Sequence, residues 1–231
     1  GLRETQIMGG QTTLDIPGTE LEFKSTVQVQ SAAAQSDEVL MMLAASDVAG
    51  TLIPTDVKKF APNQNVTLTS MAGKPAFVVN VIKKQSEFMS RASGADRLSA
   101  SLTPYKAGEK QTLLPLVANP SIQSAGSFVI QLPPAPTAAG VNGIAVSATI
   151  SDLYATPNGN AKVVSANHRW EVLGLGWGTQ IQLPSWPLAN MTPTKKVEIN
   201  FIGSTTEKPV DLDDSIIQAA THVSHSSTEF Q

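Results

Sequence analysis

Short apolar segments with a period of two dominate the chain after residue 65. Residues 66–70, 179–183 and 196–202 alternate apolar and polar side chains, and residues 76–82 form a nearly continuous apolar run. Alternation is typical of half-buried β-strands, and a short continuous run indicates a strand buried on both faces. Similar segments cover residues 98–102, 113–117, 127–132, 144–150, 161–164 and 170–175. The pattern predicts a chain built mainly of strands.

Turn signals separate these segments. Pro and Gly occur in most of the gaps, for example at residues 72–75, 133–134, 142–143 and 157–160. Strands at this spacing, with little helix between them, favour a sandwich or barrel over βαβ units. Their number and the long loops favour an all-β fold, a single jelly-roll β-sandwich with eight or more antiparallel strands.

Two short segments carry helix signals. Ser36 is a good N-cap for a helix over residues 36–45, because acidic residues follow it and favour a helix N-terminus. This predicted helix ends before Gly50. A second short helix is expected from about Asp213 through residues 215–220.

The pattern divides the chain into three parts. Residues 1–30 have weak periodicity and predict an extended N-terminal arm, with a short strand over 22–29. Residues 31–214 form the jelly-roll domain. Residues 215–231 are rich in Ser and Thr and predict a C-terminal tail. No segment repeats at a fixed period.

Composition narrows the function classes. The chain has 231 residues, and 15% of them are charged, against about 25% in an ordinary globular domain. The net charge is −3 and there are 0 cysteines, which excludes a disulfide scaffold, a thiolate zinc site and a Cys nucleophile. No apolar run approaches the ~20 residues that span a bilayer. The low charge suggests a surface covered by partners.

Candidate catalytic and metal sites have simpler explanations. The glycine-rich residues 174–178 favour a bend between two strands, because no helix follows to hold a phosphate. The three histidines could ligate zinc, but two of them lie in the predicted tail, which favours a solvated tail instead. The acidic residues near 211–214 favour capping of the second helix over acid–base catalysis. We expect no enzyme activity, cofactor or metal site. The histidines are His168, His222 and His225.

Two groups of side chains could contact partners. A basic group lies in and after a predicted strand end and could face RNA phosphates, although ordinary solvated loops are the commoner explanation. An aromatic group could stack on bases or sugars, although core packing or a subunit interface is commoner for large aromatics. The basic group is Lys83, Lys84, Arg91 and Arg97, and the aromatic group is Trp170, Trp177 and Trp186.

The two ends complete a resemblance. The chain starts at Gly1 and stops at Gln231, as if cut from a polyprotein at Gln-Gly junctions. With the β-rich domain, the arms and the few charges, it resembles a capsid protein of a picorna-like plant virus, most similar to the secovirid family and its cheravirus-type coat proteins.

The resemblance implies a structural protein that assembles with other capsid subunits, identical and different, into a non-enveloped icosahedral shell. It implies genomic single-stranded RNA as a second partner and no membrane partner. The expected location is the virion, and the host cytoplasm during assembly. The ends carried over from the family are Gly1 and Gln231 alone.

Two other function classes stay open. A carbohydrate-binding β-sandwich would use the three tryptophans as a stacking platform. A small hydrolase on a β scaffold would need a reactive Ser, but the sequence has no Gly-x-Ser-x-Gly elbow.

Overall fold

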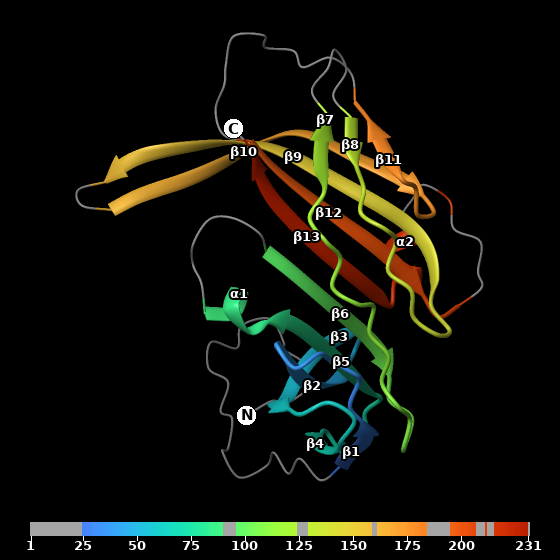
Figure 1. Cartoon of the computed structure of the whole chain (residues 1–231). Helices are drawn as coiled ribbons and strands as arrows, with labels where there is room; N and C mark the ends of the chain where they lie inside the picture. The colour runs from blue at the N-terminus through green and yellow to red at the C-terminus, as the bar shows by residue number, and fades with distance from the viewer. Residues whose placement is uncertain are drawn as a thin grey trace, which may run out of the picture.

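The computed structural model describes residues 25–89, 96–123, 129–158, 161–183, 195–206, 211 and 215–230. These residues form antiparallel strands and two short helices (Figure 1). An eight-stranded sheet has the order β10-β9-β12-β13-β6-β5-β2-β3, and a two-stranded sheet and a three-stranded sheet accompany it. The prediction of an all-β sandwich is confirmed.

The first group of strands precedes residue 105 and the second follows residue 120. The first group comprises β1 (Ser25–Gln30), β2 (Glu38–Val48), β3 (Thr51–Phe60), β4 (Asn65–Ser70), β5 (Ala76–Lys84), α1 (Gln85–Met89) and β6 (Asp96–Pro104). The second comprises β7 (Ser121–Gln123), β8 (Val129–Gln131), β9 (Asn142–Asn158), β10 (Ala161–Leu175), β11 (Gln180–Gln182), β12 (Lys195–Ser204), α2 (Ser215–Ala219) and β13 (His222–Phe230). Most predicted strands are therefore present, with shifted ends.

One face of the eight-stranded sheet is covered by the two small sheets. The β1–β4 pair packs on β2 and β5 through a core that includes Val27, Leu40 and Leu68. The sheet of β11, β8 and β7 packs on β9 and β12 through a core that includes Ile130 and Phe201. The other face, called the open face below, carries α2, whose Ile216 is buried.

The eight-stranded sheet is made of two halves with the same topology. From each outer edge inwards, the order is second, first, third and fourth strand: β3-β2-β5-β6 in one half and β10-β9-β12-β13 in the other. In each half a helix joins the third strand to the fourth. In each half, the strand before the first pairs with the strand between the second and third, as β1 with β4 and β8 with β11.

The strand registers support this equivalence residue by residue. The outer hairpin of each half has a one-residue register shift, between Ala44 and Ala45 in β2 and between His168 and Trp170 in β10. When the two halves are superimposed at these register shifts and followed from strand to strand, β6 is equivalent to β13. Ser99 of β6 is then equivalent to Ser224 of β13. These two residues also pair with each other across the β6–β13 boundary. The halves are thus related by a pseudo-two-fold axis through this pair.

The alignment reveals a short shared motif. Ser99, Ser101 and Thr103 of β6 fall on Ser224, Ser226 and Thr228 of β13. The distance between equivalent residues is not constant along the chain, because Ala44 and Ile150 are 106 residues apart, whereas Ser99 and Ser224 are 125 apart. A search at a fixed period therefore finds no repeat.

The segment 105–120 connects the halves and covers the boundary between them, called the seam below (strands β6 and β13). Ser224 Oγ donates to the Pro115 carbonyl at 2.8 Å, and Ser226 Oγ donates to Asn119 Oδ1 at 2.9 Å. Leu114 of this segment is fully buried. The prediction of a strand over residues 113–117 is wrong, because these residues pair with no described strand and the Pro115 carbonyl accepts from the side chain of Ser224 instead.

The predicted helix over residues 36–45 is also wrong. This segment is β2, which lies between β3 and β5 and buries Leu40, Met42 and Ala44 at alternate positions. Tertiary packing overrides the moderate helix propensity of Leu, Met and Ala. The second predicted helix is confirmed as α2, except that residues 213–214 lie outside the described residues.

The C-terminal segment is not a tail. Strand β13 lies between β12 and β6 in the eight-stranded sheet, with residues Ser224, Ser226 and Ser227 fully buried. The prediction of a tail over residues 215–231 is therefore wrong, since this segment is a central strand and Ser224 and Ser226 bond to the connecting segment. In the predicted arm, residues 25–30 form β1 and residues 1–24 lie outside the described residues.

Candidate functional site

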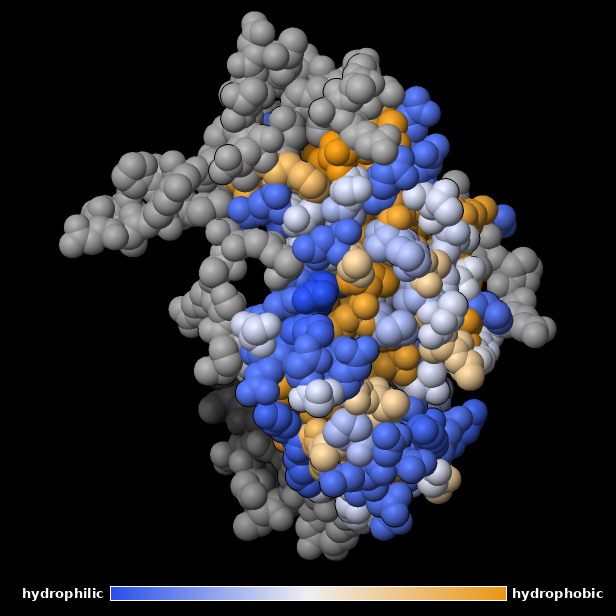
Figure 2. All heavy atoms as spheres, viewed as in Figure 1, coloured by the Kyte–Doolittle hydropathy of each residue, from blue (hydrophilic) through white to orange (hydrophobic). Residues whose placement is uncertain are grey.

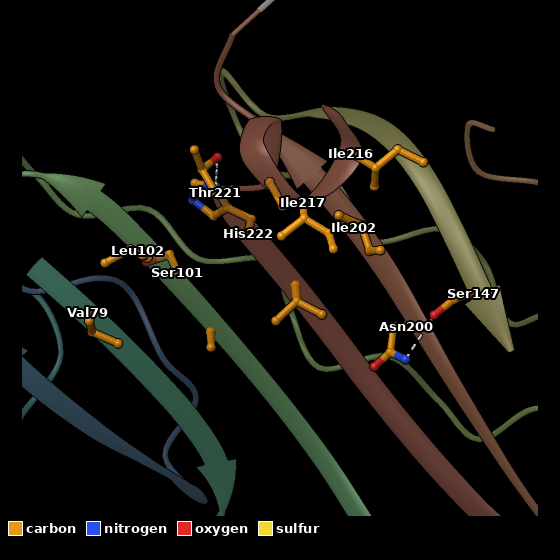
Figure 3. Close-up of a pocket in the computed structure, with 13 residues that line it drawn as sticks. Val79, Ser101, Leu102, Ser147, Asn200, Ile202, Ile216, Ile217, Thr221 and His222 are labelled. Carbon is orange, nitrogen blue, oxygen red and sulfur yellow. Dashed lines mark hydrogen bonds between the residues drawn. The ribbon is translucent and has the colours of Figure 1, made fainter. Parts of the chain in front are cut away.

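An apolar groove lies on the open face, over the seam. Its volume is about 340 Å³. It lies where β5 and β6 of the first half meet β12 and β13 of the second, with α2 along one side (Figure 3). The apolar lining residues are Val79, Ala100, Leu102, Ile202, Ile216, Ile217, Ala220 and Val223. Both halves therefore contribute to one site.

The groove results from strand alternation. Along β5, Val78 and Ile82 point to the covered side and are buried, whereas Val79 lies on the open face and is partly exposed. The register places Ile202 opposite Val223 and Val223 opposite Ala100, so these residues form one row across the seam. The small Ala100 leaves room between its larger neighbours.

The polar part of the lining is held by hydrogen bonds. Asn200 Nδ2 donates to Ser147 Oγ at 3.0 Å, and His225 Nδ1 lies 2.9 Å from Asn200 Oδ1. Because an amide oxygen only accepts, His225 Nδ1 donates this bond. Burial lowers the pKa of His225, while the nearby carboxylates of Glu198 and Asp96 oppose the shift.

His222 lies at the other end of the groove and is buried. Its Nε2 donates to the Thr112 carbonyl at 3.1 Å, and its Nδ1 lies 2.8 Å from Thr221 Oγ1. Burial lowers the pKa of His222, and the bond to Thr112 partly offsets the effect. The prediction that His222 and His225 lie in a solvated tail is wrong. His168, the third histidine, is exposed and contacts Ser151 Oγ.

The described members of the basic group are each paired with a carboxylate. Lys83 lies 2.6 Å from Asp96, Lys84 binds Asp37, and Arg97 Nε donates to Glu87 at 2.8 Å. The hydrogen bond from Lys84 lowers the pKa of the Asp37 carboxyl. Arg91 lies outside the described residues. The described part of this group therefore has little net positive charge for a phosphate backbone.

The tryptophans serve the core of the second half. Trp177 packs edge-on against Phe201, with ring centroids 5.8 Å apart, and its Nε1 donates to the Ile202 carbonyl at 2.9 Å. Trp170 also packs against this core. Trp186 lies outside the described residues. The geometry of Trp177 does not provide the free flat indole face that a carbohydrate platform requires.

The position of Trp177 depends on Gly143. A Cβ added at Gly143 would lie 2.4 Å from Trp177 Cδ2, which is closer than van der Waals contact allows. The predicted glycine-rich bend is confirmed here, because Gly176 adopts a φ of 68° between β10 and β11. The ring is therefore fixed by backbone approach that only glycine permits.

The lining of the groove suits apolar groups. None of its lining residues is an acid, a Lys or an Arg. Within the described ranges, no three His, Asp or Glu side chains gather as a metal site. Asp211, one of the predicted capping residues, is exposed, and Asp213 and Asp214 lie outside the described residues. The two described helices are too short to cross a bilayer.

Sequence reasoning missed this groove. The available signal was Ile202, an apolar residue on the otherwise polar side of the alternating segment 196–202, together with Ile216 and Ile217 in the predicted helix. The pairing of β6 with β13, which joins the two halves, has no local sequence signal. Comparisons with protein families, curated proteins and solved structures found no match to this chain.

Proposed function

We propose that the chain is a structural capsid protein, which assembles with other coat subunits into a non-enveloped icosahedral shell around single-stranded RNA. The fold that supports this role is an antiparallel β-sandwich with a small fraction of charged residues. Location in the virion is part of the same proposal.

The observation that carries the proposal is the apolar open face. Val57 on β3 is 56% exposed, Leu175 on β10 is 53% exposed, and Ile217 beside the groove is 77% exposed. These residues lie along the open face from one outer strand to the other, with the groove in the middle. Large exposed apolar surfaces of this kind mark protein–protein contacts. Figure 2 shows the opposite, covered side of the molecule, where hydrophilic and hydrophobic residues are mixed.

A jelly roll is the specific type of β-sandwich that we propose. A jelly roll has eight strands in two sheets built from Greek keys. In this protein a continuous eight-stranded sheet is covered by two smaller sheets. The proposed coat role depends on the apolar face and not on this particular strand order.

The proposed contact with RNA is supported by few unpaired positive charges. Lys83, Lys84 and Arg97 are neutralised by their partners. We propose that polyamines or metal ions balance most of the RNA charge, since the net charge of the chain is −3.

The test is velocity sedimentation of the protein from its native source, recorded at 260 and 280 nm. A fast boundary rich in nucleic-acid absorbance, with this chain and other coat-sized chains in it, is the expected result. A slow boundary of monomer size without nucleic acid would overturn the capsid proposal.

A matched pair of variants tests the open face. Ile217→Asp places a charge at an exposed apolar position of α2 and is expected to abolish assembly while the fold persists. Gln218→Asp adds the same charge at the adjacent exposed residue and is the control. Normal particles from Ile217→Asp would exclude the face around α2 as a subunit contact.

A further inference from the structure

The β9–β10 hairpin extends beyond the rest of the sheet (Figure 1). Strand β12 pairs with β9 only as far as Asp152. The next six residues of β9, Leu153–Asn158 in the sequence, pair with Ala161–Ala166 of β10. In the described part of the chain, this portion of β9 pairs with no other strand. We call these two segments, 153–158 and 161–166, the arm.

The equivalent hairpin of the first half has no such extension. Strand β5 pairs with β2 from Glu38 to Ser46, so only Asp47 and Val48 extend beyond it. They pair with Leu52 and Thr51 at a tight hairpin end. The arm is therefore an addition to the second half and not a property of the shared topology. At about 3.3 Å per residue, it reaches roughly 20 Å beyond the third strand.

A two-stranded ribbon without a third strand is marginally stable in water. Each free edge also exposes unpaired backbone N–H and C=O groups, which are a template for another strand. Proteins usually protect such edges with charged side chains, especially Lys, or with Pro. In the arm, Pro157 and Lys162 lie opposite each other near the tip, and Lys162 is its only charged residue. The remaining residues have the uncharged, strand-forming composition of a segment that pairs.

We propose that the arm is an assembly arm that pairs, by strand addition, with a second copy of this chain. A like partner is favoured because this sheet already joins two like units through antiparallel pairing of β6 with β13. A second copy also brings its own arm, so both copies satisfy their edges in one contact. The inference rests on the part of the proposed function that says copies associate. It requires neither RNA nor an icosahedral shell.

The test shortens the arm in the full chain. Deleting residues 154–157 and 160–165 leaves Leu153-Asn158-Gly159-Ala166, in which the native Asn-Gly dipeptide closes a two-residue hairpin. The parent chain is expected to form oligomers in sedimentation equilibrium as concentration rises, and the shortened chain is expected to stay monomeric. Circular dichroism and tryptophan fluorescence should be the same for both chains.

Two outcomes would overturn the arm's role. One is a shortened chain that forms the same oligomers as the parent, and the other is a parent that stays monomeric up to its solubility limit. Oligomers that depend on the arm, together with a slow, RNA-free boundary from the native source, would support the arm and contradict the capsid proposal. The two proposals can therefore fail separately.

A second measurement decides the matter if the shortened chain does not fold. The chain has no Cys, so a single Cys can be introduced without background. Ala155→Cys in the arm is expected to give covalent dimers with a short bis-maleimide, whereas Thr51→Cys at the end of the equivalent hairpin is expected to remain monomeric. Equal cross-linking of the two variants would contradict the proposal.

Discussion

The two halves of the sheet have the same strand order but different cores. In the first half, the β1–β4 pair covers β2 and β5, and the core between them contains Val, Leu, Met and Ile side chains. In the second half, the core contains Phe201 and the edge-on ring of Trp177. In the register-based alignment, Phe201 takes the place of Ile82, because these residues lie opposite Ser224 and Ser99. The shared topology thus rests on which positions are apolar and not on their shapes.

The two faces of the sheet also differ at the seam. The covered side is polar, and β13 supplies Ser224, Ser226 and His222 to the connecting segment. The open side is apolar and forms the groove. Hydrogen bonds thus fix the connection on one side of the seam, and apolar side chains line the other side.

The first prediction truncates, one at a time, the two equivalent buried side chains Phe201 and Ile82. Phe201→Ala is expected to reduce the free energy of unfolding by about 3–5 kcal/mol, and Ile82→Ala by about 2–5 kcal/mol, because each leaves a cavity in a packed core. Chemical denaturation measures both. All three tryptophans lie between residues 170 and 186, so fluorescence reports the second half alone.

This location makes the experiment a test of cooperativity. The halves share one sheet through six residue pairs of β6 and β13, so we expect Ile82→Ala to shift the tryptophan transition as well as the circular dichroism transition. If the fluorescence midpoint stays in place while the dichroism becomes biphasic, the halves unfold as independent units.

The second prediction compares the two serines on the pseudo-two-fold axis. Both are fully buried, but Ser224 Oγ donates to the Pro115 carbonyl, whereas Ser99 Oγ has no partner in the described residues. Ser224→Ala should cost about 1–3 kcal/mol, because it leaves a buried carbonyl without its donor. Ser99→Ala should be neutral or slightly stabilising. Thermal unfolding of the two variants side by side checks this prediction. Equal losses of stability would show that the hydrogen bond of Ser224 does not stabilise the fold.

Sequence patterns predicted β8 to β12 of the second half well, but they missed β7 and β13 and described the middle of the first half poorly. Clean alternation predicted β11 and β12, because their exposed and buried faces differ. Strand β3 was missed, and its sequence contains Pro54, a residue that is unusual inside a strand. In the structure Pro54 is on an edge strand next to the register shift, where a missing N–H is tolerated.

The groove and the seam were beyond sequence reasoning for a different reason. Strand β13 is rich in Ser and looks like solvated chain, yet its buried serines bond to residues more than 100 positions away. Such long-range satisfaction of polar groups has no local signature. The shared Ser-x-Ser-x-Thr motif of β6 and β13 was present in the sequence, but the unequal spacing along the halves concealed its meaning.

The third prediction uses a difference in titratable groups. The described residues of the first half include no histidine, whereas β13 carries His222 and His225, and burial lowers the pKa of both. The unfolded chain, with histidine pKa values of about 6.5, then binds more protons than the folded chain just below that pH. Stability is therefore present above about pH 6.5 and falls as the pH drops toward the lowered values.

Replacing both histidines gives the control for this effect. His222→Gln with His225→Gln is expected to lower stability at neutral pH, because the bonds to Thr112 and Asn200 are disturbed, but to flatten the slope of unfolding free energy below pH 6.5. Urea titrations at several pH values, followed by tryptophan fluorescence, measure that slope. An unchanged slope in the double variant would show that the acid sensitivity comes from carboxylates such as Asp37, whose pKa Lys84 lowers, and would move the pH-sensitive element from the seam to the first half.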